Sequence, residues 1–573
     1  MKYNKINIID DKLIQHEPVV KMYRGAESCS NMVITPVGGV LNQSQLVWNI
    51  PCTPSNYFDR RPMIKTKFTI PITCTNTSAA LGQAGTNVAQ NAALTVPGTD
   101  VTMSAYPASN LFGNCEVSIN GNQIGSYDMG KYASTVLKLS NVSKNMKKTT
   151  CASCPETSFA SIDDAYYTLS NSQGNFNDST NEYIPNGSWT FESVGVQASG
   201  VDNSKAIVAL LPGVSQVVNY TIESYEPLIL PPFIWNSHND SGEGIFGMNG
   251  LLITLNVNQS SAVRAVRTLS KSIINAASKV ALSVVGPVVI NSCELHYKTY
   301  RPPALVDFKL PSPYSIFHTY NFYTNFVSAV SAFTAANVAN EITMSNLVST
   351  GMPSLIVLWC DKPANLYASN QAKYSYPISN ITVDLGTTQN MLSNYDITDL
   401  YRLSEEAGLN QSFLSYIGQA YTIAYDSTGA VVLANAVAVE ATKKQLVGGP
   451  IILRPGISFP LPAEIATNSS GSYTWKFTAK CSTINTADST TVTPILNLLM
   501  LYDNWVSIDT TTLECKNNKN FLTVPEVLGM SKSEAVPLED TRNESGGALS
   551  SHDMVRMSGF KSPSKLSSRV RKN

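Results

Sequence analysis

The sequence contains little charge. Charged residues make up 14% of its 573 residues, against about 25% in an average globular protein. Asn, Ser and Thr supply much of the remaining polarity. Because the centres of protein interfaces are poor in charge, this composition suits a surface that neighbouring chains largely cover. The length favours two domains, since one hydrophobic core rarely serves more than about 250–300 residues.

Signals for secretion and for membrane insertion are also lacking. Residues 1–17 have no apolar core of the signal-peptide type, and the longest apolar stretch, residues 280–290, is too short to cross a bilayer. The formal net charge of -1 gives no overall attraction to nucleic acid or to acidic membranes. We therefore expect most of the ten cysteines to be reduced core residues.

Catalytic and metal-binding residues form no convincing cluster. Cys151 and Cys154 have the spacing of half a zinc or redox site, but no second Cys-x-x-Cys or His-x-His accompanies them. Loop or core cysteines explain this pair better, and its disulfide state stays open. His238, Asp240 and Ser241 offer triad residue types, but such close neighbours on a polar loop rarely face one another. The sequence predicts no enzyme, no cofactor and no metal site.

The pattern that is present is that of β-strands. Residues 64–72 alternate with period two, which places Ile64, Phe68, Ile70 and Ile72 on one face. Further strands are expected over residues 205–211, 216–222, 251–257, 288–297, 355–359, 378–385, 421–425, 431–434, 473–481 and 495–502. Many short strands separated by Gly, Pro and Asn indicate β-sandwiches or barrels rather than βαβ units.

One hairpin and two helices can be placed more closely. Asn120 and Gly121 supply the positive φ angles of a type I′ turn, which predicts a hairpin over residues 116–124. Residues 261–283 show apolar residues near one face of a helix and basic residues elsewhere. Residues 397–408 form a second, shorter helical pattern that ends at a glycine. Both helices would be inserted between strands.

Three elements occur twice in the same order, about 220 residues apart at the first two elements. They are a Pro-flanked apolar strand, a Gly-led alternating strand, and a final strand in which Leu and Tyr lie close together. The copies are residues 226–233 and 449–462, residues 250–258 and 471–481, and residues 288–300 and 494–505. The repetition suggests a duplicated domain, although three matched elements also arise by chance in β proteins.

A Pro-rich stretch between the copies marks the domain boundary. Pro302 and Pro303 are followed by Pro311 and Pro313, which makes a stiff connection. The predicted organisation has four parts: an N-terminal arm (1–40), a first domain (41–300), a second domain (301–508) and a C-terminal extension with a basic tail (509–573).

In their order, these segments resemble the double jelly-roll major capsid proteins of the adenovirus, virophage and polinton-like virus lineage. The segments are LVWNIPCTP, MIKTKFTIPI, EPLILPPF, GLLITLNVN, YPISNITVDLG, ITDLYRLSEEAGL, GPIILRPGISFPLP and GSYTWKFTAKC, which together span most of residues 41–505. The resemblance implies an all-β fold of two consecutive eight-stranded jelly-roll β-sandwiches with short inserted helices.

The same resemblance implies a structural role in an icosahedral virion. Three chains would form a pseudo-hexameric homotrimer from six similar domains, since six near-equivalent wedges tile a flat facet while the symmetry needs only three chains. The expected partners are other copies of the chain, neighbouring capsomers, and penton and minor capsid proteins. The protein would be made in the host cytoplasm or nucleus. Polar loops at residues 74–100, 170–186 and 426–429 are candidates for the outer surface.

The C-terminal segment, residues 554–573, is basic and contains no acidic residue. Its six basic residues are Arg556, Lys561, Lys565, Arg569, Arg571 and Lys572. Such a tail can bind an inner membrane, a packaged genome or an acidic minor capsid protein by nonspecific electrostatics. A solvated tail or a sorting signal explains the composition equally well.

Two other classes of protein compete with a capsid protein. A glycan-binding or adhesive β-sandwich protein, such as a viral spike or a lectin, would show a signal peptide, a fibre-like repeat or an exposed aromatic cluster, and none is found in the sequence. A β-sandwich hydrolase would need converging carboxylates. Size analysis of the expressed chain separates these classes, because a capsid protein is expected to form stable trimers.

Overall fold

The computed structural model describes residues 26–39, 44–76, 101–103, 106–136, 189–194, 215–233, 244–258, 266–268, 280–284, 287–302, 314–367, 374–409, 411–422, 433–434, 437–438, 442–445, 448–462, 465, 467, 469–483 and 489–518. Several predictions from the sequence lie outside these residues: the strand over 205–211, Cys151 and Cys154, the His238 loop, the proposed outer loops beyond residue 76, and the six basic residues of the tail.

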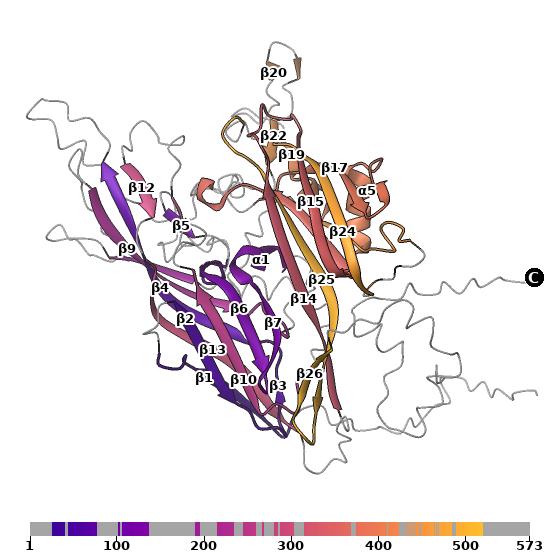
Figure 1. Cartoon of the computed structure of the whole chain (residues 1–573). Helices are drawn as coiled ribbons and strands as arrows, with labels where there is room; N and C mark the ends of the chain where they lie inside the picture. Colours follow the sequence, from indigo (N-terminus) through magenta and orange to yellow (C-terminus); the bar gives the residue numbers. More distant parts are fainter. Residues whose placement is uncertain are drawn as a thin grey trace, which may run out of the picture.

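The first half of the chain folds into two facing antiparallel sheets (Figure 1). Its eight main strands are β1 (Ser28–Ile34), β2 (Gln45–Pro51), β4 (Met63–Asn76), β6 (Phe112–Ile119), β7 (Asn122–Asp128), β9 (Ser215–Pro227), β10 (Gly250–Val257) and β13 (Val289–Arg301). One sheet has the order β1-β13-β4-β9 and the other β2-β10-β6-β7. The first is extended by β3 (Tyr57–Phe58), β8 (Trp189–Val194) and β12 (Val280–Val284), while β5 (Val101–Met103) pairs with β11 (Val266–Thr268).

The second half repeats this arrangement. Its eight main strands are β14 (Tyr314–Ser328), β15 (Asn340–Gly351), β16 (Leu355–Asp361), β17 (Ile378–Leu385), β18 (Thr388–Met391), β23 (Ile451–Leu453), β24 (Ser470–Cys481) and β25 (Ile495–Asp509). The sheets have the orders β14-β25-β16-β23 and β15-β24-β17-β18. The additional strands are β19 (Gln419–Thr422), β20 (Leu433–Ala434), β21 (Val437–Ala438), β22 (Thr442–Gln445) and β26 (Cys515–Asn518), the last paired with β25.

Both halves have the same topology. Numbered from one to eight along the chain, the main strands of each half follow the order 1-8-3-6 in one sheet and 2-7-4-5 in the other. Two four-stranded sheets connected in this way form a jelly roll. The prediction of two consecutive eight-stranded jelly rolls is therefore confirmed, and the repeated sequence segments include or overlap strands six, seven and eight of each half.

Alternating apolar residues fill the core of each sandwich. Ile64, Phe68, Ile70 and Ile72 of β4 are all fully buried on one face, as their period-two spacing predicted. Trp475 occupies the core of the second half in the same way. Each such side chain contributes about 1.5–3 kcal/mol on burial, so the two cores supply the main driving force for folding.

The predicted hairpin is confirmed in detail. β6 and β7 are joined by Asn120 and Gly121, whose φ angles are 49° and 84°. Positive φ at both central residues is the requirement of a type I′ turn, whose twist matches that of the flanking strands. The turn therefore fixes the register of this hairpin, which becomes important where the two halves meet.

Short helices lie between strands, as expected. They are η3 (Ser109–Leu111), α1 (Met129–Val136), η8 (Ala364–Leu366), α5 (Ile397–Glu406) and α6 (Phe413–Ile417). The predicted helix over residues 397–408 is confirmed as α5, whose N-cap Asp396 accepts hydrogen bonds from the backbone N–H groups of Thr398 and Asp399 at 2.8 and 2.9 Å. Among the helices that the structure describes, none is long and apolar enough to cross a membrane.

The helix predicted over residues 261–283 is wrong at both of its described parts. These are strands β11 and β12, and β12 pairs with the end of β4 from Val284 opposite Ile72 to Val280 opposite Asn76. The long β4 offers free backbone groups there, and pairing satisfies them. The β-branched valines of β12 suit a strand, so this pairing overrides a helical pattern of moderate strength.

Candidate assembly interface

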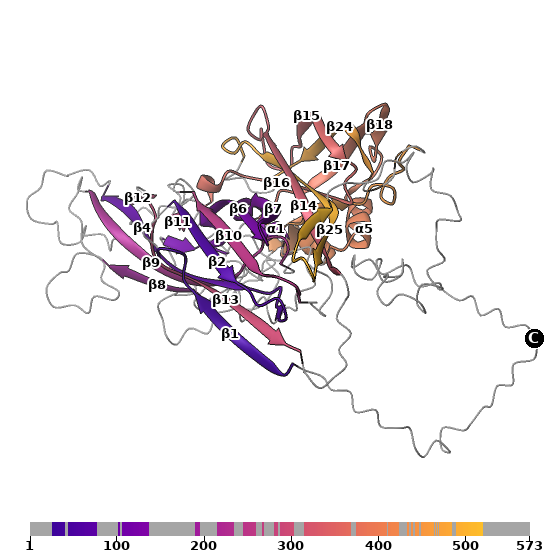
Figure 2. The same cartoon turned by 60° about the horizontal axis from the view of Figure 1, so that its bottom comes forward.

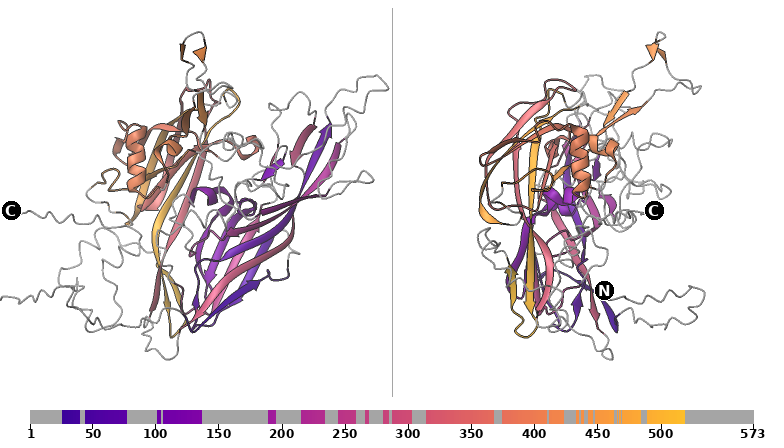
Figure 3. Two further views of the ribbon diagram at one scale, coloured as in Figure 1. Left: turned by 180° about the vertical axis from the view of Figure 1, so that it is seen from behind. Right: turned by 90° about the vertical axis from the view of Figure 1, so that its right-hand side faces the viewer.

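The two jelly rolls stand side by side and meet along one continuous contact (Figures 1 and 3). The first half contributes the β6–β7 hairpin and α1, and the second half contributes β14, β16 and the β25–β26 hairpin. For a chain with no metal or cofactor motif in its sequence, this contact is the principal candidate for a functional arrangement, because it sets how the two jelly rolls are oriented.

Asn120 is the centre of this contact. Its side-chain N–H group donates to the carbonyl oxygen of Leu513 in the β25–β26 turn at 2.7 Å and to that of Gly247 at 3.2 Å. Its side-chain oxygen accepts from the backbone N–H groups of Asn249 and Gly250 at 2.8 and 3.1 Å. One residue therefore adopts the left-handed turn conformation, which Asn tolerates, and links three segments of the chain.

Two further asparagines continue the contact in both directions. Asn122 of β7 donates to the carbonyl oxygen of Cys515 in β26 at 2.5 Å. Asn517 of β26 donates back to the carbonyl oxygens of Gln123 and Ile124 at 3.1 and 3.3 Å. We call Asn120, Asn122 and Asn517 the asparagine clamp. Because amides supply specific hydrogen bonds without charge, the clamp fixes the position of the β6–β7 hairpin against the β25–β26 hairpin at a low cost in desolvation.

Aromatic residues fill the contact above the clamp. Tyr127 of β7 stacks on Phe322 of β14 with ring centroids 4.7 Å apart, and Tyr132 of α1 meets Trp359 of β16 edge-on at 5.6 Å. Such pairs contribute about 0.5–1.5 kcal/mol each beyond the area that they bury. The outer face of the β14-β25-β16-β23 sheet is thus covered by the first half, so that this sheet is buried on both faces in its central part.

Two cations complete the contact. Lys131 of α1 places its ammonium group 3.3 Å from the ring centroid of Phe326 on β14. Arg60, which is only 8% exposed, donates to the carbonyl oxygens of Pro232 at 2.7 and 2.9 Å and of His318 at 2.7 Å, and it lies over the ring of Phe317. Arg60, which follows β3 by two residues, therefore connects the first jelly roll to β14, the first strand of the second.

A buried carboxylate supports the segment that precedes β6. Glu226 at the end of β9 accepts hydrogen bonds from the backbone N–H groups of Ala108 and Ser109 at 2.7 and 2.8 Å, and from the hydroxyl groups of Ser109 and Ser224. Burial raises the pKa of Glu226, and these hydrogen bonds oppose part of the rise. Every oxygen is satisfied by the fold itself, so Glu226 is a structural residue and not a catalytic acid.

A second polar pair lies on the side of β14 and β25 that carries the inter-half contact. The ring Nε2 of His318 is 2.9 Å from the carboxylate of Asp503, and both side chains are largely buried. Trp505 and Tyr320 contact the His318 ring edge-on. Burial, together with the charge of Asp503, raises the pKa of Tyr320. The pair joins the two strands that bear the contact.

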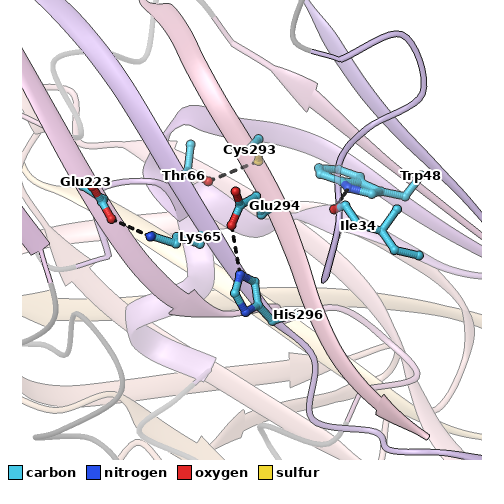
Figure 4. Close-up of polar contacts among 8 residues, drawn as sticks. All are labelled: Ile34, Trp48, Lys65, Thr66, Glu223, Cys293, Glu294 and His296. Atoms are coloured by element: carbon cyan, nitrogen blue, oxygen red, sulfur yellow. Dashed lines mark hydrogen bonds and ion pairs between the residues drawn. The ribbon is translucent and has the colours of Figure 1, made fainter. Parts of the chain in front are cut away.

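The corresponding sheet of the first half is open and polar on its outer face. Lys65 pairs with Glu223 at 2.8 Å, and this pairing raises the pKa of Lys65, while His296 lies 3.3 Å from Glu294 (Figure 4). Thr66, by contrast, points into the sandwich, where its hydroxyl group lies 3.3 Å from the sulfur of Cys293. In the described part of the chain, the first half covers this face of the second jelly roll, whereas the same face of the first jelly roll carries partly exposed charged side chains.

Groups suited to chemistry are not brought together in the described part of the chain. No set of three or more His, Cys, Asp or Glu side chains there could hold a metal ion. The seven described cysteines form no disulfide, and five of them are buried, which confirms the prediction for those five. Cys360 and Cys481 face each other across the second core with their sulfur atoms 3.4 Å apart.

The fold and the contact define a class of protein: a double jelly-roll protein whose two sandwiches are joined side by side in one chain. Residues 2–300 match the family model described as Sputnik virophage major capsid protein 1st domain, and residues 322–504 match the model described as Major capsid protein V20 C-terminal domain. The chain belongs to this family of major capsid proteins. It is a capsid protein of the virion, and the matching families are structural proteins rather than enzymes.

Solved structures agree with this fold. A chain in the cryo-EM structure of the Sputnik virophage is similar over 95% of this chain and 99% of its own length, with a TM-score of 0.68 and 16% identity. The crystal structure of the mavirus major capsid protein covers 93% of this chain and 99% of its own length, with a TM-score of 0.61 and 14% identity. No curated protein sequence matches the chain.

The inter-half contact could not be located from the sequence. Asn120 was identified as a turn residue, but its hydrogen bond to the second half is made to Leu513, which lies 393 positions further along the chain. Asn517 lies in a polar segment with no distinguishing pattern. Only the low overall charge indicated that much of the surface is covered.

Proposed function

We propose that three copies of the chain form a pseudo-hexameric capsomer and that these capsomers tile an icosahedral shell. The observation that supports this most strongly is the identical strand order of the two halves. Two similar wedges in each chain let three chains occupy six near-equivalent positions around a ring. The side-by-side arrangement of the sandwiches, with their strands running in similar directions, suits neighbouring positions in such a ring (Figure 3).

The proposed domains are those suggested by the Pro-rich stretch: jelly rolls over residues 41–300 and 301–508, with flanking segments 1–40 and 509–573. The segments outside these bounds also pair with the jelly rolls, since β1 in segment 1–40 supplies strand one of the first jelly roll and pairs with β13, and β26 adds a further strand beside β25. Partners beyond the chain itself would be penton and minor capsid proteins, and synthesis would take place in the host cytoplasm or nucleus.

Measurement of mass in solution tests the capsomer. Light scattering on the purified chain should give three times the chain mass of 62.0 kDa, and negative-stain images should show hexagonal outlines. A monodisperse monomer at micromolar concentration would argue against the proposal.

We also propose that the basic tail contacts the shell interior, either an inner membrane, the packaged genome or an acidic minor capsid protein. The support is the run of six basic residues without an acidic one in residues 554–573. Deletion of residues 554–573 should impair particle assembly or cargo retention and leave trimers intact. A full-length variant with the six residues changed to Gln should behave like the deletion, and one with Arg and Lys exchanged should behave like the wild type. Normal particles from the deletion would contradict the role.

A further inference from the structure

The two halves present equivalent surfaces because they share one topology. In each half, strand five follows a two-residue turn, residues 120–121 before β7 and residues 386–387 before β18. In each half a helix then begins directly or shortly after that strand, α1 after β7 and α5 after β18, and an aspartate at the helix start accepts backbone hydrogen bonds, Asp128 in one and Asp396 in the other. The β17–β18 hairpin with α5 is thus the counterpart of the β6–β7 hairpin with α1.

In the part of the chain that the structure describes, only one of these two counterparts is covered. The β6–β7 hairpin and α1 pack against β14, β16 and β26 through the asparagine clamp and the aromatic pairs. At the tip of the β17–β18 hairpin, Gly386, Thr387, Gln389 and Asn390 are exposed. The outer side of α5 is exposed as well, including Glu405 and Glu406.

Among the described residues, the receiving surface is likewise present twice and covered once. β14, strand one of the second half, is covered by β7 and α1, whereas β1, strand one of the first half, is exposed along almost its whole length. Met32 and Val33 of β1 are 42% and 54% exposed. Figures 2 and 3 show β1 on the side of the first half that is turned away from the second half. In soluble proteins, an edge strand that carries exposed apolar side chains is normally covered by another element or another chain.

A smaller feature repeats at the same place. β26 pairs with the end of strand eight in the second half, and β3 pairs with the end of strand eight in the first half, where Tyr57 lies opposite Tyr300. β26 carries the clamp residue Asn517, which binds the first half. β3 therefore occupies in the first jelly roll the position that β26 occupies in the second, at the end of strand eight.

We propose that the β17–β18 hairpin and α5 of one chain pack against β1 of a second copy of the chain, which repeats between chains the contact made within each chain. The inference rests on the proposed capsomer and names its chain-to-chain surface. A head-to-tail contact of this kind closes into a ring when its rotation permits. Charges agree with the pairing, because α5 exposes Glu405 and Lys298 is exposed on β13 directly beside β1. Two further exposed charges, Glu406 and Arg301, already lie 3.9 Å from Arg402 and 3.5 Å from Glu27 within the chain.

A matched pair of single substitutions tests the surface. Val33→Asp places a charge on β1. The control, Val348→Asp, places the same charge on β15, where the valine is similarly exposed at 55% but lies in the second half, in the sheet that does not contain strand one. Wild type and Val348→Asp should form trimers, and Val33→Asp should require at least about tenfold more protein to do so, as measured by native mass spectrometry. Trimers of Val33→Asp at wild-type concentrations would overturn the surface and leave the capsomer standing, whereas a monomeric wild type would overturn both.

Charge exchange keeps the inference testable if Val33→Asp does not fold. Glu405→Lys with Glu406→Lys should weaken trimers, and adding Lys298→Glu with Arg301→Glu should restore them, because the pairing is then reversed in sign. Hydrogen exchange should show protection of β1 and the β17–β18 hairpin in trimers relative to monomeric variants. Failure of the reversed pairs to restore association, or protection confined to other strands, would contradict the proposed contact.

Discussion

Single side chains hold the two jelly rolls in one orientation, and Asn120 is the residue on which most of the contact converges. It combines a φ angle of 49° with hydrogen bonds to the β25–β26 turn and to the segment before β10. Few residue types satisfy both conditions, because the backbone conformation favours Gly or Asn and only Asn adds an amide.

Substitution of Asn120 by Gly separates these two roles. The glycine keeps the turn conformation but leaves carbonyl and N–H groups without partners, so we expect a loss of about 1–3 kcal/mol in the free energy of unfolding. Asn120→Ala should cost more, since it adds strain at positive φ. Denaturant titration measures both variants. Asn337→Gly serves as the control because Asn337 is exposed and also has positive φ, at 63°. Equal losses at both positions would contradict the account.

Glu226 makes stability depend on pH. Its pKa is raised in the folded state by burial, so the folded state binds more protons than the unfolded state. The carboxyl group therefore favours folding most below its unfolded pKa, and this contribution is lost as pH rises through the folded pKa. Glu226→Gln removes the titration. The free energy of unfolding of the wild type should fall relative to the variant from about pH 4 upward, by at most about 1.4 kcal/mol per pH unit. Parallel curves for the two proteins would show that the raised pKa is absent.

At the scale of elements, local patterns located some strands and failed at others for identifiable reasons. The strand predicted over residues 378–385 has the same bounds as β17, and α5 was found from its glycine stop. β14 was missed although it has 15 residues. Its apolar residues fall on both faces, since Phe317 is buried on one and Phe322 stacks on the first half on the other. A strand covered by another domain loses the alternation by which strands are recognised.

We predict that strand β26 stabilises the contact between the two halves. Truncation after residue 518 keeps β26, and truncation after residue 509 removes it together with Asn517. The shorter chain should have a melting temperature several degrees below that of the longer one, because the clamp and the pairing with β25 are lost. It should also be cut faster by protease between the halves. Equal melting temperatures of the two truncated chains would show that β26 contributes nothing to the contact.

At the scale of the whole molecule, one topology is used in two environments. The outer face of the first jelly roll carries Lys65, Glu223 and Glu294 in the open, while the matching face of the second is covered by the first half. The sequence predicted the duplication from three repeated elements and from a family resemblance. It could not predict which copy of each surface is covered, because that depends on contacts between residues hundreds of positions apart.

The account depends on the two jelly rolls of one chain occupying neighbouring positions in a ring of six. Single-particle imaging of the purified protein tests this most directly. We predict a particle of three chains with six similar lobes around one axis, in which the contact between chains resembles the contact within a chain. A monomer, or a ring in which the two jelly rolls of a chain do not lie next to each other around the axis, would contradict it.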